Sequence, residues 1–261
     1  MLRGEVFGKG AMRQKVGNQK LKRIYRKWKE VVFAIFFPRC CPVCDEVIPY
    51  GKKICSACEK KASFIKEPAC KKCGKQLENE RQEYCSDCNR KKHCFLQGKA
   101  IFSYRKEMKL SMYRFKYANK REYADYFAEV AAWKYGDWIT KRRVEVIIPI
   151  PMFWGKMRQR GYNQADIFAK ALSRELELPV ESQLVCRVKN TVPQKELNDR
   201  QRKDNLKRAF QVRTNIVKYK RILLVDDIYT TGATIDAVGE VLKAIGVEEI
   251  YFLCICIGEG Y

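Results

Sequence analysis

Two neighbouring carboxylates and a short turn rich in hydroxyl groups stand close together in the last quarter of the chain. The carboxylates are Asp226 and Asp227, and the turn consists of Thr230, Thr231, Gly232, Ala233 and Thr234. Adjacent acids repel phosphate, but they suit a vicinal diol or a hydrated magnesium ion. A turn of small residues that opens a helix offers free backbone N–H groups and the positive end of the helix dipole to a phosphate. The pattern therefore predicts a site for a sugar that carries a 5-phosphate.

Eight of the thirteen cysteines form four Cys-x-x-Cys pairs in one segment: Cys41 and Cys44, Cys55 and Cys58, Cys70 and Cys73, and Cys85 and Cys88. Two such pairs complete a tetrahedral zinc site. Ten residues separate the first two pairs and eleven separate the last two, so we expect consecutive pairing into two zinc ribbons. Spacing leaves interleaved pairing open. Four protein ligands per site indicate structural zinc, not catalytic zinc.

The use of cysteine also bears on location and role. Paired thiols of this kind indicate metal binding in a reducing cytoplasm and not a secreted disulfide framework. Cys40 could replace Cys41 only in a longer turn, and Cys94 has no partner at this spacing. The ribbons either stabilise the fold or bind single-stranded DNA or a partner protein, and both readings stay open.

The acid pair needs a strand before it and a helix after it. Residues 222–225 form a short apolar run, which is typical of a strand buried on both faces of a parallel sheet. The acids would then lie at the carboxyl end of a central strand, where open α/β sheets bind ligands. Apolar residues at helical spacing follow the turn, and Gly246 predicts the end of that helix. The turn lacks the motifs of a P-loop and of a dinucleotide fold.

A second buried strand is predicted over residues 144–150, and a basic loop follows it. The loop carries Lys156, Arg158 and Arg160 to the same edge of the sheet. Several cations at a strand end suit a pyrophosphate or a nucleic acid backbone. A solvated basic loop is the alternative, and the prolines and the turn around Gly161 favour the binding role.

The remaining elements are predicted from periodicity and capping. We expect strands over 97–104, 183–188 and 250–257, a largely helical stretch over 110–140, and a helix capped by Asn163 that runs to residue 176. Bases such as Lys116 lie among the aromatic residues of the helical stretch, which suits either a core face with solvated charges or a nucleic acid surface. The largely polar residues 191–210 suit a mobile lid. Cys254 and Cys256 are expected to be buried thiols.

Composition predicts one substantial domain and a small one. The 261 residues include 53 basic and 30 acidic ones, a formal charge of +23 that would attract polyanions such as nucleic acid, or anionic metabolites. No apolar run is long enough to cross a membrane, and no signal peptide is evident. Residues 1–29 are basic and of low hydrophobicity, and residues 20–37 suit an amphipathic helix.

Two resemblances extend this reading. The sequence VDDIYTTGAT, residues 225–234, resembles the phosphoribosyl pyrophosphate (PRPP) motif of type I phosphoribosyltransferases. Together with the cysteine pairs, IPIPMFWGKMRQRGYNQA and VPQKELNDRQRKDNLKRAF, it resembles the competence protein F (ComF) family of bacterial DNA-uptake proteins. This resemblance implies an α/β type I phosphoribosyltransferase fold, a mostly parallel sheet flanked by helices, with an N-terminal double zinc ribbon. The expected divisions are 1–37, 38–95 and 96–261.

The family resemblance also implies residue roles. Asp226 and Asp227 would hold the ribose diol with magnesium nearby, and the turn at 230–234 would hold the 5-phosphate. Arg158, Arg160 and Lys156 would meet the pyrophosphate. Gln194, Arg202 and Asn205 match positions in the lid, and Lys116 matches a hood position whose duty stays open. Tyr229 stands where the family varies and receives no role.

Two functions of different class follow. In the first, the protein is a phosphoribosyltransferase that displaces pyrophosphate from PRPP toward an unknown acceptor. In the second, it is a cytoplasmic DNA-uptake factor that keeps the PRPP site as a sensor or relic and binds single-stranded DNA, a competence helicase or other uptake proteins. Neither chemistry requires a histidine, and the single histidine, His93, counts against a Ser-His or Cys-His hydrolase.

Overall fold

The computed structural model describes residue 36 and residues 38–189, 209–213 and 218–258. The predicted N-terminal helix lies outside these residues except for Phe36. The predicted lid, with Gln194, Arg202 and Asn205, lies outside them except for Ala209 and Phe210.

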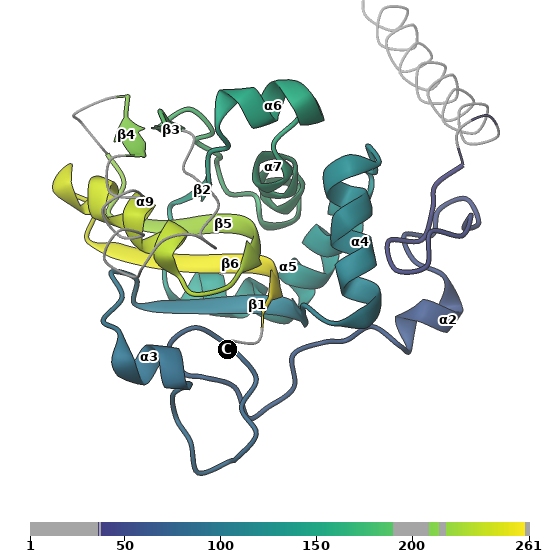
Figure 1. The fold of residues 1–261 in the computed structure, drawn as a ribbon, viewed down its shortest axis with the longest axis horizontal. Coiled ribbons are helices and arrows are strands. Elements are labelled where there is room, and N and C mark those ends of the chain that lie inside the picture. Colours follow the sequence, from purple (N-terminus) through teal and green to yellow (C-terminus); the bar gives the residue numbers. More distant parts are fainter. Residues whose placement is uncertain (1–35, 37, 190–208, 214–217, 259–261) are drawn as a thin grey trace, which may run out of the picture.

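A four-stranded parallel sheet forms the centre of the molecule. Its strands are β1 (Gln97–Ser103), β2 (Val146–Pro149), β5 (Arg221–Tyr229) and β6 (Glu249–Ile257), in the order β1-β6-β5-β2 (Figure 1). The strand predicted over 222–225 is therefore longer than expected, and both aspartates lie inside it. Pairing with β6 explains the extension, because Asp226 pairs with Cys254 and Ile228 with Cys256.

Helices cover both faces of the sheet. Along β5, Leu223 and Val225 belong to the core shared with α4 (Lys106–Tyr117), α5 (Tyr123–Lys141) and α7 (Gln164–Leu176). Ile222 and Leu224 point to the opposite face and belong to the core shared with α9 (Ala233–Ala244). A central strand buried on both sides explains why residues 222–225 are apolar without alternation. The predicted α/β fold is confirmed.

The helices begin and end close to the predicted residues, with two differences. Asn163 caps α7 as expected, since its side chain accepts a hydrogen bond from the backbone N–H of Ala165 at 3.1 Å. The stretch predicted over 110–140 is divided into α4 and α5, and Asn119 between them has φ of 53°. The basic loop predicted after β2 is instead a short helix, α6 (Trp154–Arg160), which ends at Gly161 with φ of 78°.

A second, two-stranded antiparallel sheet lies beside the main one. It consists of β3 (Val185–Arg187) and β4 (Phe210–Val212). The strand predicted over 183–188 is thus shorter than expected. In this sheet Cys186 pairs with Gln211 and Arg187 with Phe210.

Both edges of the main sheet are covered. At the β1 edge, the cysteine-rich segment pairs with the strand through Phe64 and Phe102, and Ile65 donates a backbone hydrogen bond to Ile101 at 3.1 Å. At the β2 edge, Val180 forms a parallel bridge with Ile147.

The cysteine-rich segment forms two similar units. Each contains one short helix, α2 (Ser56–Glu59) in the first and α3 (Ser86–Arg90) in the second, and each helix begins directly after a cysteine at its N-cap. The first unit packs into the core of α4 and α5, and the second packs into the core of β5, β6 and α9. Within the described residues, no helix combines the length and hydrophobicity that crossing a bilayer requires.

Candidate functional site

The acid pair lies in the last part of β5, next to helix α4. Both carboxylates are half-buried, so neither is sealed in the core. Lys116 of α4 forms an ion pair with Asp227, with 2.9 Å between Nζ and Oδ2. The backbone N–H of Asp227 donates to the carboxylate of Asp226 at 2.8 Å. Lys116 and both acids thus lie close together.

Burial and mutual repulsion govern the charge of this pair. Burial, and then the neighbouring Asp227, raise the pKa of Asp226 to about 8, against the opposing effect of Lys116 and Arg187. Burial would lower the pKa of Lys116, but the two aspartates outweigh it and raise that pKa. Near neutral pH the acid pair therefore tends to share a proton, which a bound metal ion would displace.

The basic helix α6 contacts α4, the helix that carries Lys116. Arg160 donates to the hydroxyl of Tyr117 at 2.8 Å and to the side chain of Gln164 at 3.2 Å. Burial, and then Arg187, Arg160 and Lys116, lower the pKa of Lys156, which shows that these cations share one region. Arg158 is exposed on the same helix. A cluster of cations beside two acids suits a ligand that carries both phosphate and hydroxyl groups.

The hydroxyl-rich turn connects β5 to α9. Gly232 is the N-cap of α9 with φ of 80°, a left-handed conformation that favours glycine. A Cβ at this position would lie 2.6 Å from the hydroxyl of Tyr229, so the turn also packs too closely for a side chain. Among the described residues, no side chain caps α9. The N-cap residue therefore satisfies none of the first N–H groups of α9, and phosphate binding by residues 230–234 stays a prediction.

The eight paired cysteines form two four-sulfur clusters. Cys41, Cys44, Cys55 and Cys58 form one, and Cys70, Cys73, Cys85 and Cys88 form the other, with all ligand atoms of a cluster within 4.8 Å of one another. The sulfurs of Cys44 and Cys55 are 3.8 Å apart, and those of Cys73 and Cys85 are 3.7 Å apart. Zn–S bonds of about 2.3 Å in a tetrahedron place sulfurs roughly 3.8 Å apart, so the clusters fit structural zinc. Consecutive pairing is confirmed.

The other cysteines have separate environments. Cys40 pairs with Val47 in an isolated bridge, outside the first cluster. Cys94 packs against α9, and its sulfur lies 3.6 Å from the carbonyl oxygen of Asp236. Cys254 and Cys256 are fully buried in β6, as predicted.

Four contributors to this region have no signal in the sequence. Arg187 of β3 influences the pKa of Asp226, yet it lies far from the motif along the chain. Tyr117 contacts Arg160 through its hydroxyl and its ring. His93 bonds Asp236 at 2.7 Å, and Tyr229 is buried beneath Gly232. Long-range contacts of this kind depend on packing and not on local pattern.

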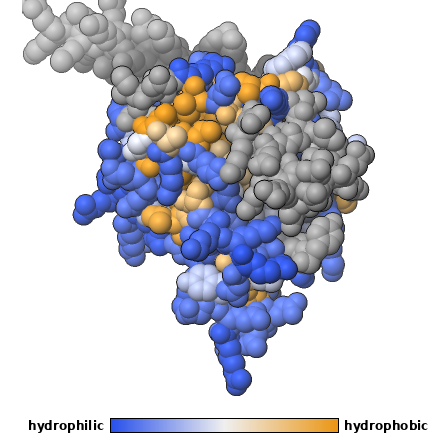
Figure 2. All heavy atoms as spheres, turned by 60° about the vertical axis from the view of Figure 1, so that its left-hand side comes forward, coloured by the Kyte–Doolittle hydropathy of each residue, from blue (hydrophilic) through white to orange (hydrophobic). Residues whose placement is uncertain are grey.

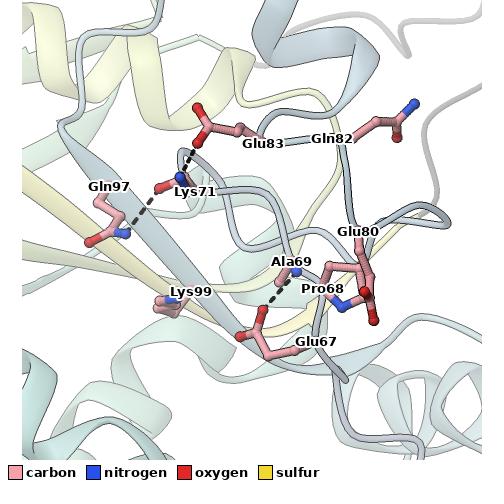
Figure 3. A pocket seen from close by; sticks show the side chains of 9 residues that line it. All are labelled: Glu67, Pro68, Ala69, Lys71, Glu80, Gln82, Glu83, Gln97 and Lys99. Carbon is pink, nitrogen blue, oxygen red and sulfur yellow. Dashed lines mark hydrogen bonds and ion pairs between the residues drawn. The ribbon is translucent and has the colours of Figure 1, made fainter.

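Two hollows have linings that do not include the acid pair. One of about 400 Å³ lies between α6, α7 and β3 and includes Asp166, Lys170 and Arg213 in its lining. The other, of about 290 Å³, lies between the second cysteine unit and β1 (Figure 3). In it Lys71 pairs with Glu83, and charges of both signs line the walls. Mixed charge of this kind indicates no single ligand class.

Comparisons with known proteins agree with the structure. The family model described as the double zinc ribbon domain matches residues 32–89, and the one described as the phosphoribosyl transferase domain matches residues 163–259. Competence protein F of Haemophilus influenzae is 34% identical over 202 residues, which cover 76% of this chain and 87% of that protein. The DNA utilization protein YhgH of Escherichia coli O157:H7 is 26% identical over 226 residues, 84% of this chain and 97% of that protein.

A purine phosphoribosyltransferase from Pyrococcus horikoshii aligns with 51% of this chain and 74% of its own, at 18% identity and a TM-score of 0.34, a likeness too low to add to the argument. The parallel sheet with helices on both faces and the two four-cysteine clusters define a phosphoribosyltransferase-type domain with a double zinc ribbon. The chain belongs to the competence protein F family.

Proposed function

We propose that the protein binds PRPP with magnesium at the carboxyl end of β5. The observation that carries this proposal is the meeting of an acid pair, a lysine and an uncapped helix start at one edge of the sheet. Asp226 and Asp227 would hold the ribose diol, and residues 230–234 would hold the 5-phosphate. Lys156, Arg158 and Arg160 would contact the pyrophosphate.

The same residues suit transfer of the phosphoribosyl group. Cleavage at C1 of PRPP leaves negative charge on the departing pyrophosphate, and cations on α6 stabilise that charge as it develops. The acids and the turn hold the two ends of the ribose, which fixes C1 toward an acceptor. Bound magnesium would neutralise further charge on the pyrophosphate. The acceptor is not evident from the described residues, so turnover and ligand sensing both fit the site.

Calorimetry tests the binding step. We expect magnesium-dependent binding of PRPP by the wild-type protein, and its loss in the double variant Asp226→Asn with Asp227→Asn. Asp137→Asn on α5 is the matched control for one lost carboxylate and should bind as the wild type does. Unchanged affinity in the double variant would remove this proposal. Release of pyrophosphate from labelled PRPP in cell extract then separates an enzyme from a sensor.

A second function, binding of single-stranded DNA, has its own observation. Leu110, Tyr113 and Tyr117 form an exposed stripe on α4, with 58%, 62% and 57% of their surface accessible. The rings of the two tyrosines lie 5.1 Å apart, and the guanidinium of Arg160 lies 4.7 Å from the ring of Tyr117. Aromatic rings beside cations suit stacked bases and a phosphate backbone.

The basic composition of the chain agrees with a polyanionic partner. On the face drawn in Figure 2, hydrophilic residues predominate and hydrophobic atoms are confined to patches. The chain as a whole carries the formal charge of +23. Its relatives include a competence protein and a DNA utilization protein, and the role proposed on that basis is cytoplasmic DNA uptake, with a competence helicase or other uptake proteins as partners.

Fluorescence anisotropy with a labelled oligonucleotide tests the stripe. The double variant Tyr113→Ala with Tyr117→Ala should weaken binding by roughly tenfold, since one stacked base contributes about 1–3 kcal/mol. Trp133→Ala, which removes an aromatic side chain that is 81% exposed on α5, is the matched control and should change little. Affinity should also fall as salt rises. Equal losses in both variants, or indifference to salt, would contradict this function.

A further inference from the structure

His93 joins the second zinc ribbon to the phosphate turn, residues 230–234, which we propose to hold the 5-phosphate. It lies five positions after the last zinc ligand, Cys88, and its side chain is only 1% exposed. Its Nδ1 lies 2.7 Å from the carboxylate of Asp236, in the first turn of α9. The other carboxylate oxygen of Asp236 accepts the backbone N–H of Cys94 at 3.0 Å. One carboxylate thus connects His93 and Cys94, in the linker between the second ribbon and β1, to the start of α9.

The phosphate turn rests directly on this linker. A Cβ at Gly232 would lie 3.0 Å from Cε1 of His93 and 2.6 Å from the hydroxyl of Tyr229. The imidazole stacks on Phe95 with 4.7 Å between centroids, and Tyr229 stacks on Phe252 at 4.6 Å. Because these side chains are packed without space, the position of His93 fixes the position of the turn.

The second ribbon in turn is fixed to the sheet. Gly98 of β1 donates its N–H to the carbonyl of Lys72 at 2.7 Å, and the side chain of Gln97 donates to the carbonyl of Lys71 at 2.9 Å. Figure 3 shows the second of these bonds beside the ion pair of Lys71 and Glu83. Lys71 and Lys72 lie between the zinc ligands Cys70 and Cys73. The zinc knuckle, β1 and the linker are therefore parts of one packed unit.

The first ribbon has no such connection among the described residues. Cys41 and Cys58 belong to the core of α4 and α5, whereas Cys70, Cys73 and Cys85 share their core with Tyr229, Ile235 and Val238. The two zinc sites thus support different parts of the molecule, and only the second lies behind the phosphate turn.

From this arrangement we propose that the second zinc ribbon positions the phosphate turn through the hydrogen bond between His93 and Asp236, so that occupancy of this zinc site sets the affinity for the phosphate of the ligand. The ligand named here rests on the proposed function. His93 is a positioning residue, because it acts through Asp236 and Gly232 and not on the ligand. If His93 served only as packing, any side chain that fills the volume of the imidazole would keep the turn in place.

Two substitutions at His93 separate these roles. His93→Phe keeps an aromatic ring over Phe95 but removes the donor to Asp236. His93→Asn loses the ring but can place an amide N–H where Nδ1 stood. Positioning through the hydrogen bond predicts that His93→Phe weakens PRPP binding by tenfold or more, while His93→Asn stays within about threefold of the wild type. The reverse order, or equal losses in both, would overturn the proposal.

A measurement without ligand keeps the inference separate from the proposed function. Hydrogen exchange of the amides of residues 230–236 should be faster in His93→Phe than in His93→Asn and the wild type. If the wild type fails to bind PRPP, the proposed function fails, and the exchange rates still decide this inference. Unchanged exchange in His93→Phe would refute it.

The two ribbons provide the matched comparison for the zinc. Cys73→Ser and Cys44→Ser should each remove one zinc ion, measured by metal analysis of the full chain. Only Cys73→Ser should accelerate exchange at residues 230–236. Acceleration in both variants, or in neither while zinc is lost, would contradict a specific role of the second site. Should a cysteine variant fail to fold, the pair of His93 variants decides alone.

Discussion

At the scale of single residues, the burial of Asp226 lowers the free energy of unfolding of the ligand-free protein. Its pKa is raised to about 8 by burial and by Asp227, whereas an unfolded aspartate titrates near 3.8. Between these values the folded chain holds a proton that the unfolded chain has released, so the free energy of unfolding falls as pH rises from about 4 to about 8. Above that range both states are ionised and the loss is complete.

The fall in the free energy of unfolding with rising pH can be tested with a variant. Asp226→Asn should raise the free energy of unfolding at pH 8 by at least about 1 kcal/mol, the value of one pKa unit. The difference should shrink toward pH 3, which lies below both pKa values, because the wild-type carboxyl is then largely protonated in both states. Chemical denaturation at the two pH values measures it. A gain of equal size at both would mean that burial of charge is not the cause.

Gly232 gives a second prediction at the same scale. Gly232→Ala meets both a φ of 80° and the hydroxyl of Tyr229 at 2.6 Å, so we expect a loss of roughly 2–3 kcal/mol of stability. Gly246→Ala is the matched control, because Gly246 has φ of 101° but open space around its Cβ. It should lose about 1 kcal/mol. Adding Tyr229→Phe should recover part of the first loss only, and thermal unfolding measures all three.

At the scale of elements, the central strand and the cysteine pairs could be predicted because their patterns are local. Four apolar residues followed by two acids predict a buried strand with the acids at its carboxyl end, the edge where such sheets bind ligands. The ending of α9 is similar: Gly246 and Val247 donate to the carbonyls of Lys243 and Leu242, the arrangement that a glycine after the last turn predicts.

The elements that differed from prediction depend on distant partners. The strand β5 continues through Asp226 because β6 offers Cys254 and Cys256 for pairing, which no local pattern reveals. Residues 154–160 belong to the stretch predicted as a basic loop, whereas the structure forms the helix α6 there, ended by Gly161. The contacts of Arg187 and Tyr117 with the site arise only in the folded chain. The roles of the site residues and the domain divisions stay predictions.

At the scale of the whole molecule, metal content is the direct test of the two ribbons. Two clusters of four thiols predict two zinc ions per chain, bound in each case by protein ligands alone. Removal of zinc by a chelator should loosen both units, because such small segments depend on metal to fold. Plasma emission spectrometry measures the stoichiometry, and one zinc per chain would contradict the consecutive pairing.

The covered edge of β1 has a consequence of its own. The ribbon segment occupies that edge through Phe64 and Ile65, and it thereby withholds a row of unpaired backbone groups from other chains. A protein stripped of zinc would present this strand to its neighbours, so the expected fate of the metal-free chain is self-assembly into insoluble aggregates. Light scattering that does not increase after chelation would show that the ribbon does not protect the β1 edge from aggregation.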